Sequence, residues 1–305
     1  PDLLKGIDSK RIATFQKAAG TALNKYRQYV QSDKISWTVI ASPSEAWAEK
    51  VFPNLPKEKQ VDALWDAIFK ATRSDLDNPV EAWTKHNDTL HEKVHYLNAK
   101  KYAKLHYTAP GTDLTIELPK GHLWCGAGSV NEKGEEFMAN MPTEEVFTVP
   151  HKDGVNGYVS STKPLSYGGN IIDNFKITFE NGRITKVEAE QGEEVLKNLV
   201  ATDEGSHRLG EVALVPHDSP ISNSGLLFYN TLFDENASNH LAIGSAYAFC
   251  LEGGKKMNRE ELEANGLNQS ITHVDFMIGS AEMNIDGITE DGKTEPVFRN
   301  GNWAF

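Results

Sequence analysis

Hydrophobic residues in the first third of the chain recur every three or four positions, which is the period of an amphipathic helix. One stripe follows a helix-start signal at Asp8 and Ser9 and comprises Ile12, Phe15, Ala19, Leu23, Tyr26 and Val30. A second helix is expected over Lys57 to Thr72. A third opens at Asn78-Pro79 and carries a stripe of Trp83, Leu90, Val94 and Leu97.

One strand is expected among these helices, over Ile35 to Ala41. The following Ser42-Pro43-Ser44-Glu45 predicts a capping box with proline at the first helical position, so that strand passes directly to helix. Residues 1–103 are therefore expected to form part of an α/β N-terminal domain that is mostly helical.

From about Lys104 the hydrophobic period changes to two, which is typical of strands. Short strands are expected over Lys104 to Tyr107, Asp113 to Leu118 and His122 to Ala127. Asn181-Gly182 predicts a type I′ hairpin between Phe175 to Glu180 and Arg183 to Glu190. Helices are expected over Glu193 to Val200 and near Asn236 to Phe249. Residues 104–305 are thus predicted to be an α+β domain on a mixed or antiparallel sheet.

The charge balance of the 305 residues argues against some partners. The 31 Lys and Arg against 43 Asp and Glu give a net charge of -12, which would repel nucleic acid. The longest mostly apolar stretch, His240 to Leu251, is too short to span a membrane. We expect a soluble protein without nucleic-acid or membrane partners. The start at Pro1, without Met, suggests that upstream residues are missing.

The cysteine content bears on compartment and on metal chemistry. Cys125 and Cys250 form no disulfide framework and no signal peptide is evident, which favours the cytoplasm. Two cysteines also exclude cysteine-rich zinc sites. Any metal must rely mainly on carboxylates and on the 10 histidines.

The segment His91 to His95 matches H-E-x-x-H, in which two histidines on one helix face hold zinc and Glu92 acts as base. The predicted stripe places both histidines at its boundary, and Lys93 sets a cation between them. An ordinary amphipathic helix flank is the interpretation we favour. A zinc protease that uses His91, Glu92 and His95 is the alternative.

Quieter patterns occur in the second part of the chain. His273 and Asp275 lie two apart in a strand and so share a face, although a core histidine beside an aspartate would look the same. Glu211 lies at the start of an apolar segment, where burial of an unpaired charge would cost much free energy. The alternative is that Glu211 lies at the end of the strand and reaches water. His240 and Tyr247 would share one face of the helix expected there. Glu144 and Glu145 run into a β-prone segment.

Four segments together resemble the metallo-aminopeptidase family that contains aminopeptidase T and aminopeptidase S. They are MPTEEVFT (141–148), RLGEVALVPHDSP (208–220), LFDENASNHLAIGSAY (232–247) and HVD (273–275), in the family's order. The resemblance implies a catalytic tyrosine at Tyr247 and metal ligands at Glu145, Glu211, His240, His273 and Asp275. It also implies a homodimer, and a chain that lacks part of the N-terminal α/β domain.

This ligand set suits hydrolysis. Three carboxylates and two imidazoles are enough for a shared pair of divalent ions, such as zinc, cobalt or manganese, that keeps positions open for water and substrate. The expected reaction is hydrolysis of the N-terminal peptide bond of a peptide with a free amine, with Tyr247 donating a hydrogen bond to the oxyanion. A non-catalytic, metal-stabilised binding protein is the alternative from another class, and Glu144 is the alternative to Glu145.

Separate substitutions of two histidines distinguish the two enzyme hypotheses. His273→Ala should abolish hydrolysis of aminoacyl anilides, because it removes an implied ligand. His91→Ala should leave the rate within about twofold of the wild type, as for a helix-flank residue. The opposite pattern in the two rates would favour the H-E-x-x-H protease.

Overall fold

The computed structural model describes residues 7, 11, 14–15, 18–19, 22–31 and 33–305. None of the helices within these residues is long and apolar enough to cross a membrane. The N-terminal helices are α2 (Asn24–Gln31), α3 (Glu45–Val51), α4 (Lys57–Ala71) and α5 (Pro79–Lys100). The later helices are α6 (Glu193–Val200), α7 (Pro220–Asn223), α8 (Thr231–Asp234) and α9 (Arg259–Ala264). Short 3₁₀ turns include η2 (Glu235–Ala237) and η3 (Ala248–Cys250).

Two large sheets make up most of residues 104–305, and all the pairs of named strands are antiparallel. The larger sheet has nine strands in the order β10-β9-β7-β2-β1-β14-β15-β16, with β8 beside β9. These strands are β1 (Lys104–Ala109), β2 (Thr112–Glu117), β7 (Val155–Ser160), β8 (Leu165–Tyr167), β9 (Asn170–Glu180), β10 (Arg183–Gln191), β14 (Asn284–Ile288), β15 (Thr294–Arg299) and β16 (Asn302–Trp303).

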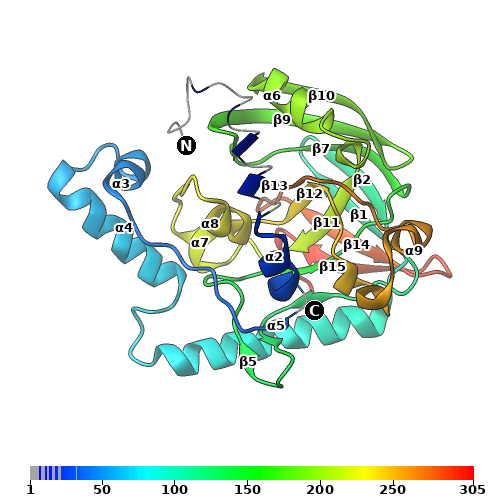
Figure 1. Cartoon of the computed structure of the whole chain (residues 1–305), viewed down its shortest axis with the longest axis horizontal. Helices are drawn as coiled ribbons and strands as arrows, with labels where there is room; N and C mark the ends of the chain where they lie inside the picture. Colours follow the sequence, from blue (N-terminus) through cyan, green and yellow to red (C-terminus); the bar gives the residue numbers. More distant parts are fainter. Residues whose placement is uncertain (1–6, 8–10, 12–13, 16–17, 20–21, 32) are drawn as a thin grey trace.

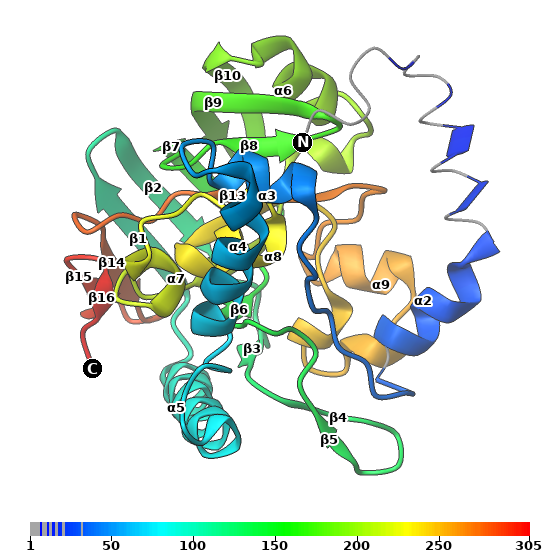
Figure 2. The ribbon, with the colours of Figure 1, turned by 90° about the vertical axis from the view of Figure 1, so that its left-hand side faces the viewer.

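The smaller sheet has five strands in the order β13-β12-β11-β6-β3. They are β3 (Cys125–Gly126), β6 (Val146–Thr148), β11 (Leu209–Leu214), β12 (His240–Gly244) and β13 (His273–Met277). A separate two-stranded ribbon of β4 (Ser129–Val130) and β5 (Glu136–Phe137) extends from the body (Figure 2). Of the two sheet types expected from the sequence, mixed and antiparallel, the structure has the antiparallel one.

One hydrophobic core joins the two sheets. Val212, Leu241 and Phe276 of the five-stranded sheet belong to the same buried cluster as Leu105 and Ile177 of the nine-stranded sheet. Each of these side chains is at most 1% exposed. The five-stranded sheet thus directs one face into the core, which leaves its other face for polar side chains.

The N-terminal helices pack in two places. Helices α3 and α4 lie to one side of the sheets (Figure 1). They form a second buried cluster with residues of the 221–237 segment, in which Leu64 of α4 and Phe233 of that segment take part. Helix α5 instead joins the main core through Leu90 and Leu97. The boundary that we propose at residue 104 falls in the short connection between α5 and β1.

Several elements expected from the sequence are present. Helices α4, α5 and α6 match their predicted spans, and the Asn78 side chain accepts a hydrogen bond from the Glu81 amide with proline at the first turn. Strands β9 and β10 form the predicted hairpin, in which both Asn181 (φ 49°) and Gly182 (φ 79°) have the positive φ that a type I′ turn requires.

Three expectations for residues 35–249 are wrong. The segment Ile35 to Ala41 forms only one isolated bridge, between Val39 and Asn140, and is not a strand. Helix α3 is capped by Ser44, whose side chain accepts from the Trp47 amide, so Pro43 precedes the helix. The segment near Asn236 to Phe249 is not a helix either, because η2, strand β12 and η3 replace it. Its short apolar run is buried on both faces, and periodicity cannot separate such a strand from a helix.

The first helix is only partly as predicted. Helix α2 covers the end of the expected span, whereas Ile12 and the Asp8-Ser9 start signal lie outside the described residues. Phe15, Leu23 and Tyr26 of the predicted apolar stripe are 74%, 48% and 58% exposed, so these three side chains are not buried against the body.

Two glycines in turns allow a matched test of the hairpin. Gly182 and Gly292 have similar φ angles of 79° and 83°, but a Cβ on Gly182 would overlap the carbonyl oxygen of Lys152, whereas a Cβ on Gly292 meets nothing within 4 Å. Gly292→Ala should lower the free energy of unfolding by about 1–2 kcal/mol, the cost of the left-handed conformation. Gly182→Ala should cost at least about 1 kcal/mol more because the backbone must shift. Equal losses in denaturant titrations would contradict this account.

Candidate metal centre

The strand register gathers the polar residues on the outer face of the five-stranded sheet. Glu211 on β11 pairs with Ala242 on β12, which pairs with Asp275 on β13. Residues directly opposite one another share a face, as do residues two apart along a strand. His240 therefore joins this row from β12, and His273 joins it from β13.

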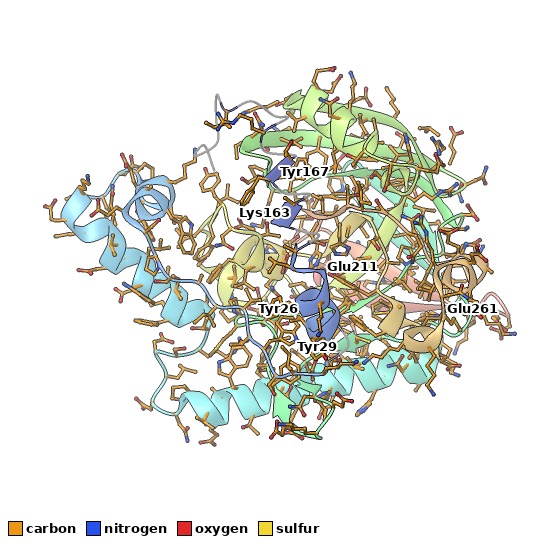
Figure 3. The ribbon with its side chains drawn as sticks, in the orientation of Figure 1. Tyr26, Tyr29, Lys163, Tyr167, Glu211 and Glu261 are labelled. Atoms are coloured by element: carbon orange, nitrogen blue, oxygen red, sulfur yellow. The ribbon has the colours of Figure 1, made fainter. Side chains whose placement is uncertain are left out.

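Small residues leave room between these side chains. Ala242 stands between Glu211 and Asp275 in the register, and Gly244 stands opposite His273. The small side chain of Ala242 leaves room between the two carboxylates, and Gly244, where a Cβ would overlap the Thr272 carbonyl oxygen, allows β12 and the start of β13 to approach closely. Glu211 lies deep in the body of the molecule (Figure 3) and is 5% exposed.

Carboxylate oxygens and imidazole nitrogens approach closely at this face. His240 Nε2 lies 3.2 Å from Glu145 Oε2 and 3.7 Å from Glu211 Oε1. His273 Nε2 lies 3.2 Å from Glu211 Oε2 and 3.4 Å from Asp275 Oδ1. The side chains form two groups that share Glu211: one adds Glu145 and His240, and the other adds His273 and Asp275. Within each group, one ligand atom from every residue lies within 4.8 Å of the others.

Backbone carbonyls fix the orientation of both histidines. Nδ1 of His240 lies 3.1 Å from the Ser238 carbonyl oxygen, and Nδ1 of His273 lies 2.8 Å from the Ser245 carbonyl oxygen. A carbonyl only accepts, so each Nδ1 carries the proton and donates it. In the neutral ring Nε2 then presents its lone pair to carboxylate oxygens. Such an arrangement requires either a proton or a metal cation between them, and it is the arrangement of metal-binding histidines. The donor set therefore fits divalent ions.

The close contacts in this cluster shift the pKa values of its members. Burial lowers the pKa of His273, but hydrogen bonds with Asp275 and Glu211 outweigh burial and raise the pKa to about 11. Burial likewise lowers the pKa of His240, and the bonds with Glu145 and Glu211 raise it well above its usual value. Burial raises the pKa of Glu211, while its bonds to the two imidazoles bring that pKa down to about 2. For Glu145, burial dominates and raises the pKa.

Adjacent glutamates serve different neighbours. Glu145 faces His240, whereas Glu144 forms a two-point hydrogen-bonded ion pair with Arg73, with a 2.9 Å bond from Nη2 to Oε2. His86 Nε2 lies 3.5 Å from the same Glu144 carboxylate. Both glutamates lie immediately before β6, and their side chains contact different partners. Glu144 thus ties this loop to the N-terminal helices.

Tyr247 reaches the site by a different path from the one expected. It follows β12 in an extended conformation (φ -83°, ψ 120°), so the shared helix face inferred for His240 and Tyr247 is wrong. Its ring centroid nevertheless lies 4.7 Å from that of His273. Phe249 stacks on Tyr247 at 5.1 Å, and Phe147 meets it edge-on at 6.2 Å. Burial raises the pKa of the Tyr247 phenol, which keeps it a hydrogen-bond donor at neutral pH.

A cavity of about 500 Å³ covers this face of the sheet. All six residues named by the sequence line it, together with Glu235, which sequence analysis did not single out. Glu235 lies within the matching segment 232–247, but no spacing pattern distinguished it from the neighbouring Asp234.

The H-E-x-x-H residues lie on α5 and do not form a metal group among the described residues. His91 lines the cavity wall, while Glu92 and His95 are exposed. The His91 and His95 rings are 6.3 Å apart, and Lys93 between them donates to the Phe305 carbonyl oxygen at 2.7 Å. This is the helix flank that the sequence favoured.

An antiparallel sheet with carboxylates and oriented histidines in a cavity defines a metallohydrolase type of site. Comparison with known proteins gives its family: the model of the thermophilic metalloproteases (M29) matches residues 1–303. Aminopeptidase AmpS of Bacillus subtilis is 73% identical over 305 residues, which are all of this chain and 74% of that protein. Aminopeptidase T of Thermus thermophilus is 46% identical over 304 residues and is covered to the same extent.

A solved structure agrees with these matches. Wild-type AmpT from Thermus thermophilus superposes with a TM-score of 0.92 at 45% identity, over 99% of this chain and 73% of that one. The chain therefore belongs to the M29 family of metalloproteases. This confirms the resemblance drawn from the four segments, and with it the expectation of an enzyme of the metallo-aminopeptidase class.

The two adjacent glutamates give a matched pair of variants. Glu145→Gln should reduce bound metal and activity together, because it removes a carboxylate that faces His240. Glu144→Gln should retain metal stoichiometry and lower the free energy of unfolding by about 3 kcal/mol or more, because Arg73 is left without its buried partner. Elemental analysis and denaturant titration check both. Loss of metal only in Glu144→Gln would move the assignment by one residue.

Proposed function

We propose that this chain hydrolyses the N-terminal peptide bond of peptides at a site for two divalent ions, held by Glu145, Glu211, His240, His273 and Asp275. The observation that carries the proposal is that both imidazoles direct Nε2 at carboxylates while their Nδ1 groups are bonded to carbonyl oxygens. Zinc, cobalt and manganese all suit such nitrogen and oxygen ligands.

Glu211 is the residue proposed to serve both ions. Its two carboxylate oxygens face different histidines, which supports one oxygen for each ion. Glu145 and His240 then complete one position, and His273 and Asp275 complete the other. When bound, such ions polarise a scissile carbonyl and lower the pKa of water.

The residues around the ions supply orientation and a hydrogen bond. The Tyr247 side chain is held between His273 and Phe249, and in the described part of the chain its hydroxyl has no hydrogen-bond partner. It is available to donate to the oxygen that becomes negatively charged when the carbonyl is attacked. Phe147, Phe249 and Tyr247 offer an apolar wall to a substrate side chain.

A homodimer acting on peptides in the cytoplasm is part of this proposal. The relatives named above are aminopeptidases, which supports peptides with a free N-terminus as substrates. The exposed apolar side chains of Phe15, Leu23 and Tyr26 are a surface that a second copy would cover.

Chelation tests the requirement for metal. Dialysis against a chelator should remove hydrolysis of leucine p-nitroanilide, and added Zn²⁺, Co²⁺ or Mn²⁺ should restore it. Occupancy should also fall as the pH drops below the raised pKa values of the two imidazoles, because protons then compete with the metal for Nε2. Undiminished turnover by protein shown by elemental analysis to be metal-free would refute the proposal, and turnover with none of the metals would favour a binding protein.

Tyr247→Phe isolates the proposed oxyanion contact. Removal of the hydroxyl should lower kcat by about 10² to 10³ while metal content stays at the wild-type value, as for loss of one oxyanion donor. The melting temperature should change little, because the ring contacts remain. A kcat near the wild-type value would assign Tyr247 to packing alone.

A further inference from the structure

We propose that Glu235 binds the α-ammonium group of the substrate and thereby selects peptides with a free N-terminus. This inference rests on the proposed function and names the residue that makes the enzyme an exopeptidase. It follows from the position of Glu235 in the cavity, from the lack of any partner for its carboxylate, and from the charges around it.

The backbone on both sides of Glu235 is held firmly. Asp234 accepts hydrogen bonds from the amides of Phe228 and Asn230 at 2.8 and 3.0 Å. Asn236 accepts from the Glu144 amide at 2.7 Å and donates to the Leu232 carbonyl oxygen at 2.9 Å. Because its neighbours are fixed, the 3₁₀ turn η2 holds the backbone of Glu235 at the wall of the cavity.

The carboxylate of Glu235 is not used by the protein itself. In the part of the chain that the structure describes, it forms no hydrogen bond and no ion pair, and it is outside both metal groups. Its immediate neighbour Asp234, by contrast, is satisfied by two backbone amides. A carboxylate that lines a cavity without a partner is expensive unless a ligand supplies one.

The charges around Glu235 indicate that this ligand is a cation. Glu145, Glu211 and Asp275 all act electrostatically on Glu235 as like charges, and His240 is the opposing group. The proposed ions would engage those three carboxylates together with the histidines, whereas Glu235 lies outside both groups and keeps a carboxylate without a partner.

No lysine or arginine in the described wall of the cavity is free to neutralise Glu235. Lys255 is the one lysine among the lining residues, and no arginine is found there. Its ammonium group lies 3.2 Å from Asp33 and 6.0 Å from the centre of the Phe249 ring. The cation must therefore arrive with the substrate. A peptide whose N-terminal carbonyl is at the metal centre carries its ammonium group two bonds away from the carbonyl carbon, and Glu235 shares the cavity with that centre.

A pair of ligands that differ only in the amine tests this assignment. L-leucinol and 4-methylpentan-1-ol share an alkyl chain and a hydroxyl, and only leucinol carries the ammonium group. Calorimetric titration of the metal-loaded wild type should show at least about tenfold tighter binding of leucinol. In Glu235→Gln this preference should fall to within about twofold, and the affinity for 4-methylpentan-1-ol should be unchanged.

Two further variants serve as controls. Glu282→Gln makes the same chemical change at an exposed position and should keep the full preference for leucinol. Glu235→Asp keeps the charge but shortens the side chain, so an intermediate preference is expected, and this variant also provides the test should the glutamine variant fail to fold. Elemental analysis should find wild-type metal content in all three.

The outcomes separate this inference from the proposed function. An equal loss of affinity for both ligands, an unchanged preference for leucinol, no preference in the wild type, or loss of metal from Glu235→Gln would each overturn the role of Glu235. Failure of the wild type to hydrolyse leucine p-nitroanilide would instead overturn the proposed function, even if the amine preference depended on Glu235.

Discussion

Three acidic side chains placed close together on one face of the five-stranded sheet are the main constraint on this structure. Glu145, Glu211 and Asp275 meet on one sheet face, where their mutual repulsion and their removal from water are both unfavourable. His240 and His273 stand between them and are fixed at Nδ1 by backbone carbonyls, so their free nitrogens point at the acids. Protons can fill these positions, but divalent ions would neutralise more charge with the same ligands.

The sheet architecture makes this arrangement possible. The inner face of the five-stranded sheet packs on the nine-stranded sheet and fixes the strands, while the small side chain of Ala242 leaves space on the outer face. The N-terminal helices then reach the site indirectly, because Arg73 and His86 bind Glu144 beside the proposed ligand Glu145. The segment that carries Glu144 and Glu145 therefore links the stability of the N-terminal helices to the geometry of the site.

Local patterns in the sequence were sufficient wherever an element is determined by its own residues. The hairpin at Asn181-Gly182 and the helix that begins at Asn78-Pro79 are of this kind. The segment 236–249 is not, because all five residues of His240 to Gly244 are buried, and the seven-residue step from His240 to Tyr247 does not by itself distinguish a helix from a strand and turn. The six predicted site residues nevertheless line one cavity, because the motifs that suggested them do not depend on the secondary structure of this segment.

Glu235 shows the limit of such motifs. Its side chain is distinguished from that of Asp234 only by what surrounds each carboxylate, and those surroundings come from segments distant in sequence. The exposure of Phe15, Leu23 and Tyr26 has a related reason. An apolar helix face predicts a contact, but it does not identify the surface that the face will contact.

The central claim is that Glu211 serves both ions, and metal stoichiometry tests it most directly. Equilibrium dialysis against Zn²⁺ followed by elemental analysis should give two ions per chain for the wild type. Asp275→Asn should weaken one ion and retain the other, because Asp275 belongs to only one of the two groups, whereas Glu211→Gln should lose both. Retention of two ions by Glu211→Gln, or a single ion in the wild type, would contradict the account.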